Sequence, residues 1–252
     1  MKKQTKKRKL AVILVIMTLL VVQTLPVFFP RPLGSQKISD NNIILYYQAK
    51  GEQGAIEVFT LLKEKAEEIR SKMNVQSDKP TKVFLYQSQF QLAIREAGLI
   101  TMTFAPSWHI GDSHNGNIMM VSPYTIVKGH THETILNATL HELVHSIVFT
   151  LNSDLPYFWD NGLATYLSAQ EPTKAELGSW PIPAMNEMHT ENGLTFSNMG
   201  GYAYSYKYIE FLDKTYGWEK VLEFSSGSMD YSEVFGKTEK ELYDEWCCYM
   251  NK

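Results

Sequence analysis

The sequence predicts an α+β fold, with a small mixed sheet that has an edge strand and packs on a long buried helix, followed by a mainly helical C-terminal half. Two observations indicate it: short apolar runs of strand length end before residue 122, and segments of helical periodicity dominate afterwards. One further helix, apolar throughout, precedes the sheet. The 252 residues are 44% hydrophobic, which is enough apolar material for one sizeable core.

The N-terminus has the pattern of a transmembrane helix. Residues 10–29 carry no charge, and a helix of about 20 residues matches the hydrocarbon core of a bilayer. The basic tail, residues 1–9, is expected to stay in the cytoplasm, with the rest of the chain outside. We favour an uncleaved single-pass anchor in the cell membrane, because no small-x-small cleavage site follows. The alternative is a signal peptide whose removal would give a secreted protein.

Residues 30–42 are predicted to be a linker, and residues 43–252 a folded domain. The first half of this domain is expected to contain, in chain order, an amphipathic helix over 55–74, a strand over 83–86, a helix capped by Ser88 and ended by Gly98, a turn at 111–116, and a strand over 117–121 that is buried or lies at a sheet edge. The formal net charge of −3 gives no indication of nucleic-acid binding.

The second half is predicted to be helical. Its expected elements, in chain order, are a buried helix over 131–152, a helix from near Asp160 to Ala169, a long loop over 171–199 with a short helix near its middle, a helix over 200–216 ended by Gly217, and a terminal amphipathic helix over 237–250. Cys247 and Cys248 are adjacent, so an unstrained disulfide between them is excluded by geometry. They are expected to be small apolar residues on the last helix.

A metal-binding pattern lies in the buried helix. His141, Glu142 and His145 form H-E-x-x-H, and two histidines four residues apart on a helix share one face. Imidazole nitrogen suits Zn²⁺, and the neighbouring carboxylate suits a general base that deprotonates a metal-activated water. Burying three ionisable groups without a partner costs several kcal/mol, which favours a metal site over histidines satisfied by hydrogen bonds alone.

The segment HELVHSIVF followed by PYFWDNGLATYL resembles the gluzincin metallopeptidases, in particular the bacterial peptidase MA-like families. The tyrosine-rich GYAYSYKYIEFLDKTYG and the closing VFGKTEKELYDEW are similar to later segments of those families, so the resemblance covers about residues 80–249. It implies a thermolysin-like fold and a zinc-dependent hydrolase of peptides or proteins, with His141 and His145 as zinc ligands and Glu142 as catalytic base.

The resemblance leaves the third zinc ligand open. The family has a glutamate before the G-L-A-x-Y motif, where this chain has Asn161. Three interpretations remain: Asp160 supplies the missing carboxylate, Asn161 binds weakly or through a water, or the site has lost metal and activity. Asp160 has an ordinary alternative as a helix N-cap. Other candidate ligands, none of them favoured by the sequence, are Asp154, Glu187, Glu191 and His189.

The resemblance also implies that a tyrosine of the tyrosine-rich helix faces the metal and stabilises an oxyanion. Tyr202 and Tyr206 share a face of that helix, and Tyr206 is the predicted catalytic tyrosine. An extended peptide is expected to bind along the edge strand at 117–121. The chain is thus predicted to be a membrane-anchored extracytoplasmic zinc metallopeptidase. The alternative is an inactive peptidase-like domain that binds a peptide or a protein at the membrane.

Overall fold

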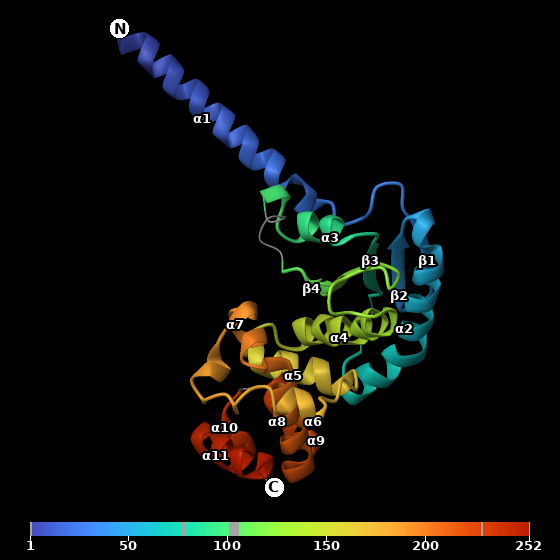
Figure 1. Ribbon diagram of the computed structural model, residues 1–252, viewed down its shortest axis with the longest axis vertical. Helices are drawn as coiled ribbons and strands as arrows, with labels where there is room; N and C mark the ends of the chain where they lie inside the picture. Colours follow the sequence, from blue (N-terminus) through green and yellow to red (C-terminus); the bar gives the residue numbers. More distant parts are fainter. Residues whose placement is uncertain (1, 77–78, 101–105, 228, 252) are drawn as a thin grey trace. The chain divides into compact units, whose positions relative to one another are not determined.

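The computed structural model describes residues 2–76, 79–100, 106–227 and 229–251, and it has a mixed α+β fold with one small sheet (Figure 1). The chain divides into two compact units: residues 1–60 with 80–136, and residues 61–79 with 137–252. The sheet belongs to the first unit, and the second is helical. The α+β class with a small mixed sheet, preceded by an apolar helix, is therefore confirmed.

The first helix, α1 (Lys2–Thr24), continues into a 3-10 turn, η1 (Leu25–Phe28). From Arg8 to Phe28 this segment is long and apolar enough to be a membrane span or a signal sequence, and its apolar side chains are exposed. The expected N-terminal apolar helix is therefore present, and it begins within the basic tail rather than after it.

The five strands of the sheet have the order β1-β2-β3-β5-β4. In chain order they are β1 (Gln36–Ser39), β2 (Ile43–Tyr47), β3 (Thr81–Tyr86), β4 (Gly111–His114) and β5 (Asn117–Val121). The three central strands β2, β3 and β5 are parallel, and β1 and β4 pair antiparallel at the two edges. Residues 117–121 were expected to be a buried or an edge strand; the buried alternative is confirmed and the edge alternative is wrong, because β5 lies between β3 and β4.

The two edge strands β1 and β4 were not predicted, because neither has an apolar pattern. Asn115 and Gly116 both have positive φ, 50° and 70°, which closes a tight hairpin and pairs β4 with β5. Gly111–His114 was expected to be part of a turn, since it lacks the apolar alternation of a half-buried strand. Gln36–Ser39 lies in the expected linker and is largely exposed, so it carries no burial pattern either. Polar edge strands escape a search for apolar periodicity.

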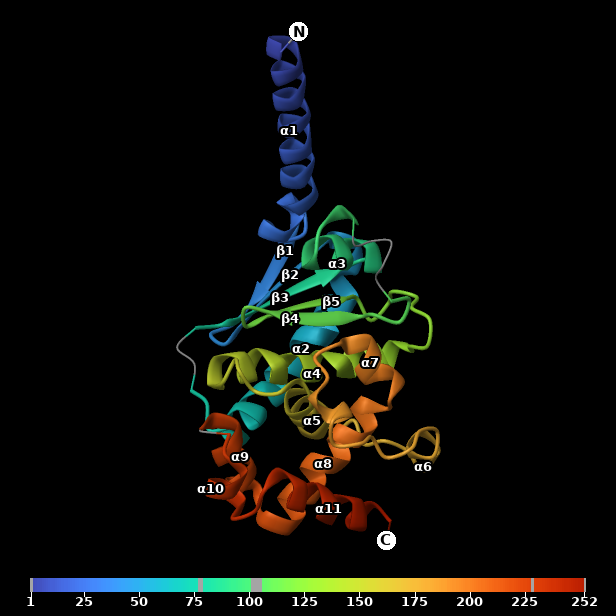
Figure 2. The same cartoon turned by 90° about the vertical axis from the view of Figure 1, so that its left-hand side faces the viewer.

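Two helices make the crossovers that parallel strands need. Helix α2 (Glu52–Lys72) connects β2 to β3, and α3 (Gln89–Glu96) follows β3 and packs on β3, β4 and β5 (Figure 2). The predicted cap of α3 is confirmed, since the Ser88 side chain accepts a hydrogen bond from the Gln91 N–H. Gly98 follows the helix with φ of 92°, a conformation that L side chains rarely adopt.

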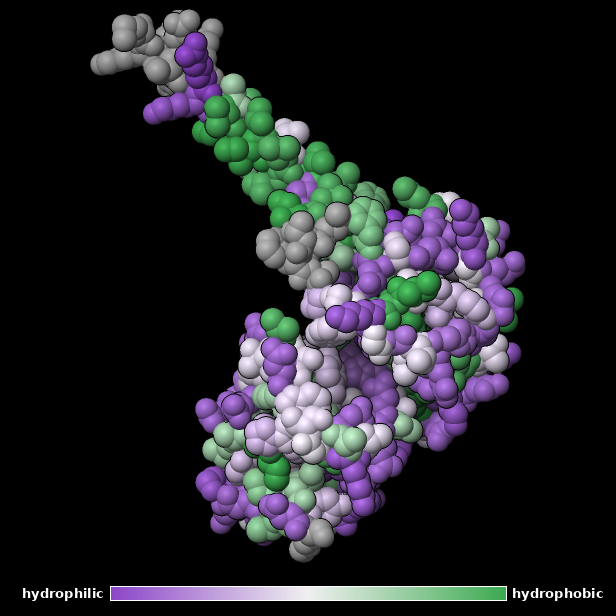
Figure 3. Space-filling model, viewed as in Figure 1, coloured by the Kyte–Doolittle hydropathy of each residue, from purple (hydrophilic) through white to green (hydrophobic). Residues whose placement is uncertain are grey.

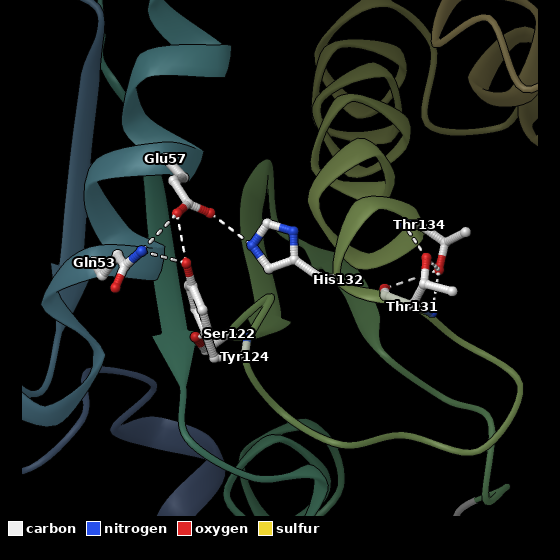
Figure 4. Close-up of polar contacts among 7 residues, drawn as sticks. All are labelled: Gln53, Glu57, Ser122, Tyr124, Thr131, His132 and Thr134. Atoms are coloured by element: carbon white, nitrogen blue, oxygen red, sulfur yellow. Dashed lines mark hydrogen bonds and ion pairs between the residues drawn. The ribbon is translucent and has the colours of Figure 1, made fainter.

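A polar cluster in the first unit fixes the start of the next helix, α4 (His132–Leu151). Figure 4 shows Glu57 of α2 between Tyr124, which follows β5, and His132. The Tyr124 hydroxyl donates to Glu57 over 2.7 Å, and His132 Nε2 lies 2.7 Å from the same carboxylate. Burial alone raises the pKa of Glu57, but these hydrogen bonds outweigh it and leave the pKa lowered. Thr131 caps α4 by accepting from the Thr134 N–H.

The second unit is built from helices around an aromatic core. After α4, its elements are α5 (Tyr157–Leu167), α6 (Lys174–Leu177), η4 (Glu187–His189), α7 (Gly193–Asn198), α8 (Gly201–Tyr216), α9 (Trp218–Ser226), α10 (Tyr231–Phe235) and α11 (Glu239–Met250). The core side chains stack or meet edge to face; they include Phe158, Trp159, Tyr208, Phe224 and Trp246. Helices α9 and α10 were not predicted. Cys247 and Cys248 are free thiols on α11, as expected.

Helices α5 and α8 form the closest helix pair of this unit, and Gly162 makes it possible. A Cβ at Gly162 would lie 2.8 Å from the Ser205 carbonyl oxygen and 2.7 Å from Cγ1 of Ile209. The backbone of α8 therefore occupies the space that any side chain would need. The glycine of the G-L-A-x-Y segment is thus explained by packing.

Candidate metal centre

Helix α4 brings its two histidines together at one point. The Nε2 atoms of His141 and His145 lie 2.9 Å apart, and their rings meet edge to face. The helix around them is apolar and almost wholly buried, and His141 itself is only 7% exposed. The i, i+4 spacing of the motif therefore produces the convergence expected from the sequence.

The outer ring nitrogens of both histidines face oxygen acceptors. Nδ1 of His141 lies 3.1 Å from Oε1 of Gln170, and Nδ1 of His145 lies 2.8 Å from Oδ1 of Asp160. An amide oxygen and a carboxylate can only accept, so a hydrogen bond from Nδ1 to either of them requires the ring proton on Nδ1. In a neutral imidazole the other nitrogen, Nε2, then carries a lone pair. In that tautomer both Nε2 lone pairs point toward the same small space.

With both Nδ1 atoms protonated, the two Nε2 lone pairs repel unless a positive charge lies between them, whereas with one ring in the other tautomer one Nε2 donates to the other. A shared proton is disfavoured, because burial and the neighbouring charge of His145 hold the pKa of His141 well below its ordinary value of 6.5. A divalent metal can bind both Nε2 atoms without either histidine taking up a proton. Metal-ligating histidines characteristically place a carboxylate or carbonyl oxygen behind the ligating nitrogen, as Asp160 and Gln170 do here. The two histidines therefore fit a metal.

The two predicted third ligands each have another contact in the structure. Asp160 contacts Nδ1 of His145, on the side of the ring away from Nε2, where a carboxylate orients the ring of a metal-binding histidine without touching the metal. Asn161 is 2% exposed and its amide nitrogen donates to the Tyr157 carbonyl oxygen over 2.9 Å. Within residues 2–76, 79–100, 106–227 and 229–251, no group of three or more His, Cys, Asp and Glu side chains is arranged to hold a metal ion.

Asp160 is also not an N-cap. Helix α5 begins at Tyr157, three residues earlier than expected, with Pro156 in the cap position. Among the other candidate ligands, His189 lies 3.2 Å from Glu239, and the Glu187 carboxylate accepts the Ala184 N–H. Glu187 is thus tied to its own segment and His189 to the start of α11.

Glu142 and a tyrosine complete the surroundings of the histidines. Glu142 is 7% exposed, and its negative charge contributes to raising the pKa of Tyr202, after burial and the nearby Tyr157. The Tyr202 ring lies 6.1 Å from the His141 ring. Tyr206 instead packs on Tyr166, with ring centroids 5.3 Å apart. Tyr202 and Tyr206 share a face of α8 but lie one turn apart, and Tyr202 is the one whose ring lies near His141, while the catalytic role expected for Tyr206 stays a prediction.

Gln170 was missed by the sequence analysis, and a backbone motif places it. The N–H of Gln170 bonds to the Thr165 carbonyl oxygen, and the N–H of Ala169 to that of Tyr166, which together form a Schellman ending of α5. Ala169 adopts φ of 56°, a left-handed conformation that costs about 1 kcal/mol for a residue other than glycine. Because an alanine gives no signal for this turn, the sequence could not reveal which side chain returns to His141.

Comparison with known proteins adds no family: no protein-family model and no curated protein matches the chain. The chemistry of the site is therefore defined by its own side chains. Two converging lone pairs, a buried acid and a protonated tyrosine lie on α4 and α8 of one compact unit. Such a set can bind a cation, take up a proton and donate a hydrogen bond.

Proposed function

We propose that His141 and His145 bind Zn²⁺ and that the protein is a metallopeptidase anchored in the cell membrane, with the domain outside the cytoplasm. The observation that carries the proposal is the convergence of the two Nε2 atoms at 2.9 Å, with oxygen acceptors behind both rings. Zinc in this position supplies Lewis-acid activation of water and of a peptide carbonyl. The histidines position it, and Asp160 and Gln170 keep both rings in the binding tautomer.

The other side chains have defined roles in this proposal. Glu142 accepts a proton from water as the peptide carbonyl is attacked, and then passes it to the leaving amine. Tyr202 donates a hydrogen bond to the oxyanion that forms. Its raised pKa, caused first by burial and then by Tyr157 and Glu142, keeps the hydroxyl protonated at neutral pH. Glu142 is buried and Tyr202 is half-buried, which strengthens these interactions relative to water.

The membrane part of the proposal rests on α1. The segment Arg8–Phe28 has the length and apolarity of a span, and the basic residues cluster before it. Basic flanks stay on the cytoplasmic side, so the domain that follows is placed outside. The expected substrates are peptides or proteins of that compartment.

The peptidase activity can be tested with a mixed peptide pool and mass spectrometry. The full-length Glu142→Gln protein should keep its zinc but lose cleavage, by about 100-fold or more, because the proton acceptor is gone. Glu133→Gln is the matched control, since Glu133 is an exposed carboxylate in the first turn of the same helix. Equal cleavage by the wild type and the Glu142→Gln variant would refute the proposed mechanism.

One observation favours a second candidate, an inactive peptidase-like module that binds a peptide or protein. The position of the expected third ligand is Asn161, a neutral side chain that is buried and bonded to its own helix. Under this alternative the wild type neither binds zinc tightly nor cleaves peptides. Asn161→Glu should then create zinc binding that the wild type lacks. In an active enzyme the same change only strengthens binding that is already present.

A further inference from the structure

We propose that the turn after α3, residues 97–100, contacts the lipid bilayer and holds the first unit against the membrane surface. This inference rests on the proposed anchoring by α1 and is independent of the proposed peptidase activity. The partner is the interfacial region of the membrane itself. Both α1 and the turn belong to the same compact unit.

The turn is hydrogen-bonded to α1. Gln23 donates from its amide nitrogen to the Ala97 carbonyl oxygen over 3.3 Å and accepts the Ile100 N–H over 2.7 Å. One side chain thus satisfies a donor and an acceptor of the turn's backbone. Besides Thr18 and Thr24, whose hydroxyls bond within their own helix, Gln23 is the polar residue of this stretch, and such a group in lipid needs a partner.

Gly98 allows the turn to approach α1 closely. A Cβ at this position would lie 2.5 Å from the Gln23 carbonyl oxygen and 2.6 Å from its side-chain nitrogen. Its φ of 92° also favours glycine. The backbone of the turn therefore packs directly on the backbone of α1.

The position of Gln23 along the span sets the depth of the turn. Gln23 precedes Phe28, the end of the apolar segment, by five residues, which corresponds to about 8 Å along the axis. From Lys9, the last basic residue, to Gln23 is about 21 Å, less than the roughly 30 Å of the hydrocarbon core. When α1 spans the bilayer, the residues bonded to Gln23 are consequently brought to the level of the lipid rather than above it.

The side chains at this level suit lipid. Leu99 and Ile100 are 40% and 59% exposed, and Phe28 and Phe29 at the end of the span are 74% and 63% exposed. Figure 3 shows a mainly apolar surface along α1. An exposed apolar turn that is bonded to the end of a membrane span is thus continuous with the lipid-facing surface. Leucine, isoleucine and phenylalanine are residues that partition into the interface.

A depth measurement tests the inference. The full-length chain, with Cys247 and Cys248 replaced by serine, carries Ile100→Cys labelled with an environment-sensitive fluorophore. It is reconstituted in phosphatidylethanolamine–phosphatidylglycerol vesicles and purified by flotation, so that only inserted protein is measured. Lipids with a nitroxide near the glycerol end of the acyl chain quench a label at the interface. Ile126→Cys is the matched control, because Ile126 is 99% exposed in the same unit but is not bonded to α1.

The label at Ile100→Cys should lose most of its fluorescence, and the label at Ile126→Cys should keep it. Adding Gln23→Ala should restore fluorescence at position 100 while the protein still floats. Equal fluorescence at the two positions, whether both are quenched or both are bright, would overturn the inference. Flotation and cleavage are read separately, so a failure of anchoring or of peptidase activity is distinguishable from a failure of this contact.

Discussion

Replacing Asp160 with alanine should weaken zinc binding without abolishing it. The carboxylate lies 2.8 Å from Nδ1 of His145, with 25% of its side chain exposed. Loss of the oxygen acceptor behind a metal-binding histidine typically lowers metal affinity about 10–100-fold, or about 1.4–2.7 kcal/mol. A direct ligand would be expected to cost far more. The prediction thus separates the direct-ligand role proposed from the sequence from the contact with Nδ1 of His145 that the structure shows.

The assay is a competition titration of zinc against a chromophoric chelator, with the full-length protein in detergent. Asp154→Ala is the control, because Asp154 is an exposed carboxylate just before α5. It should leave affinity unchanged. Thermal unfolding of the metal-free proteins checks that both variants are folded. An Asp160→Ala protein that binds no zinc would make Asp160 a direct ligand, and one with wild-type affinity would remove its role altogether.

Three further predictions follow from the same contacts. Tyr202→Phe should lower kcat about 100- to 1,000-fold by removing an oxyanion donor, whereas Tyr206→Phe, one turn along α8, should leave kcat near the wild-type value in a peptide-cleavage assay. The metal-free protein should lose stability as pH falls below about 6.5, by up to about 1.4 kcal/mol per pH unit. Burial and the charge of His145 lower the pKa of His141 in the folded state, so the unfolded state binds the proton first. Urea titrations of the wild type and of His141→Asn at about pH 7.5 and 5.5 measure the difference in unfolding free energy. Gly162→Ala should destabilise the fold by about 1–3 kcal/mol, because its Cβ meets backbone of α8, and unchanged urea unfolding would contradict that packing.

Periodicity predicted the long helices and the placing of the two histidines on one helix face. The apolar N-terminal helix, the buried α4 and the i, i+4 spacing of His141 and His145 each follow from patterns that repeat along many residues. The polar edge strands β1 and β4 could not be predicted from such patterns, since they bury few side chains and have no apolar periodicity. Their pairing depends on a hairpin turn and on the neighbouring strand.

The surroundings of the histidines were less predictable, because they depend on register between helices. Asp160 was expected at the start of α5, but α5 begins at Tyr157, so Asp160 meets the outer nitrogen of His145. Helical spacing placed Tyr202 and Tyr206 on one face but could not say which turn of α8 lies at His141. Gln170 contacts His141 because Ala169 adopts a left-handed conformation, which an alanine in the sequence does not predict.

The central claim is that His141 and His145 together bind one zinc ion. The most direct measurement is the zinc content of the full-length protein after chelation, dialysis and titration with Zn²⁺, followed by elemental mass spectrometry. We expect one zinc per chain in the wild type and its loss in His141→Ala, with His132→Ala, at the exposed start of the same helix, unchanged. A wild-type protein that stays free of zinc under titration, or a His141→Ala protein that still binds it, would contradict the assignment.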